Sequence, residues 1–121
     1  MSHELVAQKL TAAGLLYTVK DETQKIAQIT KADVVKTGHR FKVTKDSIDE
    51  PIGVTVIECN DPAQKSEVQA FCDSQAKLIE QMSPGKYTQA YLAASGAFVV
   101  MMNFRLADQA VADEIRAALE S

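Results

Sequence analysis

Hydrophobic residues along the chain repeat with two different periods, which predicts a domain that contains both helices and strands. A spacing of three to four residues is typical of amphipathic helices, and alternation is typical of half-buried strands. The helical spacing occurs in three segments: 2–13, 62–82 and 108–119. The strand patterns occur at 15–20, 39–46, 52–59 and in both arms of a hairpin over 87–104. The prediction is an α+β fold with three helices and a five-stranded antiparallel sheet, in the order α-β-β-β-α-β-β-α.

Residues 24–38 fit neither period well. KIAQIT (25–30) is compatible with a further strand. In TKADVVKTG (30–38), Thr30 could cap a single helical turn closed by Gly38, or Val34 and Val35 could extend a strand. We interpret this segment as a short irregular piece.

The junction between the segments 52–59 and 62–82 carries the strongest local signal. Asp61 is a favoured N-cap, Pro62 suits the first helical position, and Gln64 stands where a capping box requires it. Both cysteines lie here, with Cys59 before the junction and Cys72 about 15 Å along the helix axis. A disulfide needs Cα atoms within about 7 Å, so no bridge is expected.

Neither cysteine predicts catalysis. Cys72 is expected to be a small buried hydrophobe on the apolar stripe of its helix. Cys59 lies nearer the positive end of that helix and could be somewhat activated, but no base is evident for it. His39 is interpreted as a solvated edge residue. His3 is the only other histidine in the sequence, so no metal site is expected. The glycines stand apart, so no phosphate loop and no cofactor is predicted.

Composition restricts the class of protein further. A chain of 121 residues with 46% hydrophobic and 24% charged residues predicts a single globular domain over 1–121. The net charge is −3 and the basic residues are scattered, so nucleic-acid binding is not expected. The longest apolar run, 97–102, is too short to span a bilayer. The start of the chain has no signal-peptide pattern, so we expect a cytoplasmic protein, with export left open if a leader precedes this sequence.

The second arm of the hairpin is apolar on both sides. Phe98, Val100, Met102 and Phe104 point one way, and Ala97, Val99 and Met101 point the other way. Three helices can cover one face of such a sheet, so the second apolar side needs another cover. The candidates are a second copy of the chain, a client protein, or part of the first helix. We expect Tyr91, Val99 and Met101 to be the partner-binding residues.

The stretch KYTQAYLAASGAFVVMMNFRLADQAVADEIRAALE resembles the C-terminal half of class I type III secretion chaperones and of YbjN-like domains. The matching elements are the turn at Ser95-Gly96, the apolar strand 99–104, Leu106, and a final helix with Ile115 and Leu119. LVAQKLTAAGLLYTV at the start also resembles the first helix and strand of these families. The resemblance implies a small acidic bacterial protein, cytoplasmic and homodimeric, that binds proteins and has no catalytic residues.

These observations leave three hypotheses for function. The first is a non-enzymatic protein-interaction domain, chaperone-like or regulatory, dimeric through its sheet or its second helix. The second is a small-molecule-binding or catalytic domain with a pocket between sheet and helices and with Cys59 or His39 at the rim. The third is an accessory domain of an exported bacterial protein, because Glu58, an acidic residue ending a strand before a long helix, resembles small α+β domains of bacterial lipoproteins.

Overall fold

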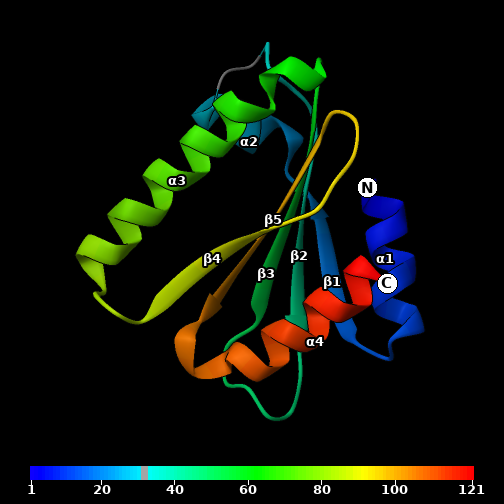
Figure 1. Cartoon of the computed structure of the whole chain (residues 1–121), viewed down its shortest axis with the longest axis vertical. Coiled ribbons are helices and arrows are strands. Elements are labelled where there is room, and N and C mark those ends of the chain that lie inside the picture. Colours follow the sequence, from blue (N-terminus) through cyan, green and yellow to red (C-terminus); the bar gives the residue numbers. More distant parts are fainter. Residues whose placement is uncertain (31–32) are drawn as a thin grey trace.

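The fold is α+β, as the sequence predicts, with four helices and five strands in the part of the chain that the structure describes (Figure 1). This computed structural model describes residues 1–30 and 33–121. The elements are α1 (His3–Ala12), β1 (Leu16–Asp21), α2 (Thr23–Ile29), β2 (Val35–Thr44), β3 (Ile52–Cys59), α3 (Lys65–Met82), β4 (Tyr87–Leu92), β5 (Phe98–Arg105) and α4 (Gln109–Glu120). Short 3-10 turns, Pro62–Gln64 and Leu106–Asp108, precede α3 and α4.

The five strands form one antiparallel sheet in the order β1-β2-β3-β5-β4. Strands β1, β2 and β3 follow one another as neighbours, but β5 lies between β3 and β4. The chain therefore leaves the centre of the sheet at the end of β3, runs along one face as α3, and returns at the edge as β4. This route places α3 over the β4–β5 side of the sheet (Figure 1).

The main difference from the predicted order is one additional helix, α2. Of the segment KIAQIT, residues 25–29 belong to this helix and Thr30 is its C-cap, so the segment is not a strand. Asp21 turns the chain out of β1 by accepting hydrogen bonds from the Thr23 nitrogen (2.9 Å) and hydroxyl (2.6 Å). Ile26 then packs against Gly38 of β2, where a Cβ atom would lie 2.6 Å from its Cδ1. The strand alternative is correct from Val35 onward, and residues 31 and 32 of the ambiguous segment lie outside the described residues.

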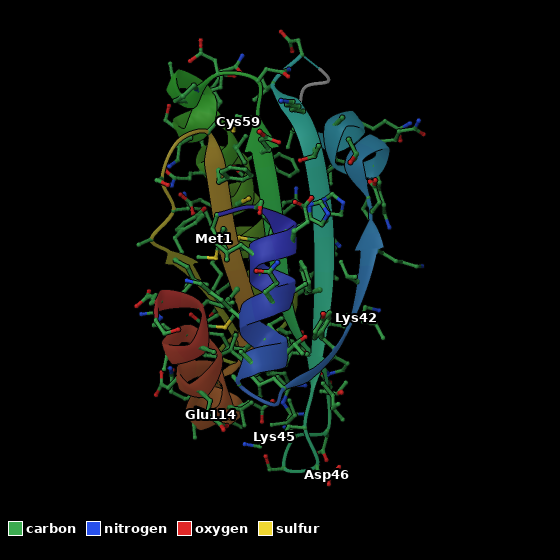
Figure 2. The ribbon with its side chains drawn as sticks, turned by 90° about the vertical axis from the view of Figure 1, so that its right-hand side faces the viewer. Met1, Lys42, Lys45, Asp46, Cys59 and Glu114 are labelled. Carbon is green, nitrogen blue, oxygen red and sulfur yellow. The ribbon has the colours of Figure 1, made fainter. Side chains whose placement is uncertain are left out.

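Helices α1 and α4 cover one face of the sheet and lie side by side on it (Figure 2). The helical spacing of 2–13 and 108–119 predicts inward positions that include Ala13 and Ala110. Most of the inward positions are buried, but Ala13 and Ala110 are exposed, and Ala112 is buried in place of Ala110. The buried apolar residues on this face include Val6, Leu10, Phe41, Val43, Ile52, Val54, Val56, Val100, Met102, Phe104, Val111, Ile115 and Leu119.

Two polar contacts fasten α4. Lys9 Nζ of α1 donates to the Leu119 carbonyl at 2.9 Å, which joins two helices from opposite ends of the sequence. Glu114, which breaks the apolar pattern of its helix, points outward and pairs with Lys45 Nζ at 2.6 Å (Figure 2). Its charge therefore remains solvated.

The opposite face is covered by α2 and α3, which corrects the expectation that all helices share one face. Val99 and Met101 of β5 are only 2% and 8% exposed, because α3 of the same chain covers them. The second apolar side of β5 therefore needs no cover from another molecule.

The predicted junction before α3 is confirmed in detail. The Asp61 carboxylate accepts from the Ala63 nitrogen at 2.9 Å, and the Gln64 side chain accepts from the Asp61 nitrogen at 3.0 Å. The capping box is thus complete on both sides. It fixes the point at which the chain leaves the sheet and α3 begins.

Candidate protein-binding groove

Helix α3 covers only part of its face of the sheet. It packs on β4 and β5, while the shorter α2 packs on β2. Between them a groove of about 570 Å³ lies over the middle strands. Its main lining residues are Ile26 and Ile29 from α2, Phe71, Gln75 and Ile79 from α3, and Arg40, Lys42, Thr55, Met101 and Asn103 from the sheet.

The apolar stripe predicted for α3 exists, but only its first half is buried. Val68 and Cys72 are buried, whereas Leu78, Ile79 and Met82 are 52%, 42% and 83% exposed. We call Phe71, Leu78, Ile79 and Met82 the α3 flank. The sequence pattern could show that these positions share one side of a helix, but not that the second half of this side is left exposed.

The orientation of α3 follows from helical geometry. At about 100° per residue, a helix that points Cys72 at the sheet turns Phe71 and Met82 to one side and Gln69 and Asp73 to the other. The contacts agree with this, since Phe71 lines the groove and Gln69 and Asp73 face β4. The α3 flank therefore lies along the groove side of the helix.

Tyr91, one of the predicted partner residues, fastens α3 to β4. Its hydroxyl lies 2.8 Å from Asp73 Oδ1 and 2.9 Å from the Gln69 carbonyl, and Gln89 Nε2 donates to the same Asp73 oxygen at 3.0 Å. Burial and the hydrogen bond to Asp73 raise the pKa of Tyr91. The tyrosine is half-buried and its hydroxyl is already engaged within the chain.

Both cysteines are free and buried, as expected for Cys72. Burial, and next the charge of Asp73, raises the pKa of Cys72 to about 11, and burial also raises the pKa of Cys59. Both thiols are therefore protonated near neutral pH, the opposite of what a nucleophile requires. Cys72 lines the groove, whereas Cys59 is absent from its lining.

His39 lies on the other face of the sheet and is buried, not the solvated edge residue that the sequence predicts. Its ring stacks on that of His3 at 3.6 Å between centroids, with 10° between the planes. Burial, and next the charge of His3, lowers the pKa of His39, while Asp21 and Glu4 oppose this. His39 is therefore not at the rim of the groove, and no sequence pattern marks its contact with His3.

Within residues 1–30 and 33–121, no group of three His, Cys, Asp or Glu side chains is placed to hold a metal ion. No helix in this part of the chain has the length and apolar character needed to cross a bilayer. The second hypothesis placed a pocket between the sheet and its helices, but with Cys59 or His39 at the rim; the basic residues that line the groove were missed, although one signal for them is present. Arg40 and Lys42 alternate with Phe41 and Val43 on β2, and a charged side on an inner strand indicates an uncovered face.

No protein-family model matches the chain, and no curated protein or solved structure matches it either. The resemblance to secretion chaperones and YbjN-like domains therefore stays a prediction. The groove and the α3 flank together present apolar side chains beside a sheet face that the helices cover only in part.

Proposed function

We propose that the chain is a non-enzymatic protein-interaction domain that forms a homodimer through the α3 flank. The observation that supports this is the exposure of Leu78, Ile79 and Met82 along one side of a helix. Contiguous exposed apolar side chains on a small domain are typical of an interaction surface. The contact expected at Val99 and Met101 is thereby replaced by one on the helix that covers them.

A second copy of the chain is the partner that fits this surface. The α3 flank is interrupted only by Gln75 and contains no charged residue. Asp73 and Glu80 are turned away from it and are engaged by Tyr91 and by the Gly85 nitrogen. Two chains of net charge −3 can therefore place their flanks against each other about a two-fold axis without opposing like charges.

The chemistry of the buried groups supports a non-enzymatic role and a reducing location. Cys59 and Cys72 are free thiols with raised pKa values, so neither is suited to nucleophilic attack. Free cysteines persist in reducing compartments, and we therefore also propose a cytoplasmic location.

Light scattering at micromolar concentrations tests the homodimer. We expect a mass twice that of the 13.2 kDa chain, and the monomer mass for the double variant Leu78→Glu/Met82→Glu. The matched control is Leu16→Glu, which changes a side chain 73% exposed on β1, away from α3, and should leave the dimer intact. A wild-type chain of monomer mass at every concentration, or a flank variant that stays dimeric, would refute the proposal.

A further inference from the structure

Three basic side chains share the uncovered part of the sheet face. Lys20 of β1 stands directly opposite Arg40 of β2 in the antiparallel pairing, and directly opposite residues point to the same face. Lys42 follows two positions after Arg40 and therefore joins them. Arg40 and Lys42 line the groove, so this basic cluster forms the edge of its floor.

The basic cluster is not neutralised within the described residues. None of its three members makes an ion pair there, although Lys25, Lys36 and Lys45 elsewhere lie 3.7, 3.7 and 2.6 Å from carboxylates. Like charges that face each other across two strands destabilise a sheet. The chain has 16 acidic residues against 13 basic ones, so unpaired bases are not forced by composition. A carboxylate from another molecule would remove this repulsion.

The remaining surfaces of the groove restrict the kind of molecule that carries the carboxylates. Ile29, Phe71 and Ile79 give it apolar walls on both sides of the basic floor. Glu50, which also lines the groove, already accepts from the Tyr87 hydroxyl at 3.2 Å and lies 3.9 Å from Arg105. A ligand must therefore offer apolar groups to the walls and negative charge to Arg40 and Lys42.

We infer that the groove binds an acidic, amphipathic segment of another protein. Its carboxylates lie over the basic cluster, and its apolar side chains lie against the walls formed by α2 and α3. The inference rests on the proposal that the chain is a protein-interaction domain. It shares Phe71 and Ile79 with the α3 flank but depends on the basic cluster, which the homodimer does not use. Charge complementarity of this kind provides specificity for the partner.

Fluorescence anisotropy with defined peptides tests this. The probes are a labelled peptide that alternates leucine and glutamate, the same peptide with glutamine, and the same peptide with lysine. We expect the glutamate peptide to bind at least about tenfold more tightly than the other two, and added salt to weaken it. Arg40→Gln/Lys42→Gln should lose about tenfold in affinity for it.

The matched control is Lys77→Gln/Lys86→Gln, which removes the same charge from exposed positions outside the groove lining. It should leave affinity unchanged, and circular dichroism should show that both double variants fold. Absence of binding, equal binding of the glutamate and glutamine peptides, or an equal loss in the control would overturn the inference. Binding that depends on Arg40 and Lys42 but occurs only with anionic lipid vesicles or an oligonucleotide would also overturn it, by assigning another class of partner.

The two proposals fail separately. A chain that is monomeric by light scattering but still prefers the glutamate peptide refutes the homodimer and keeps the acidic partner. A chain that is dimeric but does not discriminate between the peptides keeps the homodimer and refutes the acidic partner.

Discussion

Removing the Tyr91 hydroxyl should loosen α3 from β4 without unfolding the chain. In Tyr91→Phe the ring stays, but the contacts at 2.8 Å to Asp73 and 2.9 Å to the Gln69 carbonyl are lost. A hydrogen bond of this kind contributes about 1 kcal/mol net to stability. The Asp73 carboxylate is exposed, so solvent screens its charge and the bond is no stronger than one to a neutral acceptor. The opening equilibrium of α3 should therefore rise about fivefold.

Cys72 reports this opening because it is a residue of α3 that faces the sheet and is buried while α3 stays in place. With a pKa of about 11 and a buried sulfur, the closed state hardly reacts with a disulfide reagent near pH 8, so labelling follows the open state. In a Cys59→Ala background, Tyr91→Phe should speed labelling of Cys72 about fivefold. The control is Tyr17→Phe, which removes a hydroxyl 3.3 Å from Thr11 Oγ1, near α1. An unchanged rate in Tyr91→Phe, or the same acceleration in the control, would show that Tyr91 does not hold α3 closed.

Three further outcomes are expected. Burial and the charge of His3 lower the pKa of His39, so on acidification the unfolded chain binds a proton at this histidine before the folded chain does. The free energy of unfolding, measured with urea, should therefore fall as the pH drops below the ordinary imidazole value of about 6.5. The fall should be smaller in His39→Gln. Asp61→Ala should cost about 1 kcal/mol in the free energy of unfolding and Asp61→Asn only a few tenths; equal losses would contradict the cap. Gly38→Val should cost about 1–3 kcal/mol through overlap with Ile26, and Gly38→Val/Ile26→Ala should lose less than the sum of the single changes, as a double-mutant cycle measures.

The strands and the long helices could be predicted because their periods are distinct over many residues. The seven residues of α2 could not, since the only strongly apolar positions, Ile26 and Ile29, suit a helix but do not exclude a strand. The contact that starts the helix is local: the Asp21 carboxylate accepts hydrogen bonds from the Thr23 nitrogen and hydroxyl. One extra helix then changes how much of the sheet is covered.

The candidate site depended on tertiary arrangement more than on sequence pattern. Both sides of β5 are apolar as predicted, but the path from β3 to β4 carries α3 onto the face opposite α1 and α4, so Val99 and Met101 are covered internally. The pattern of β3, with Val56 and Ile57 pointing to opposite sides, already indicates cover on both faces. The position of α3 on the sheet determines that Cys72 is buried and Ile79 is exposed. The spacing of hydrophobic residues in the sequence does not predict this position.

The bond from Lys9 to the Leu119 carbonyl has a consequence for biosynthesis. During translation, α1 emerges from the ribosome before α4, whose Ile115 and Leu119 complete the cluster that buries Val6 and Leu10. Until then the apolar side of α1 faces solvent as part of a nascent chain. The apolar side of α1 is therefore accessible to proteases and holding chaperones until α4 has been made.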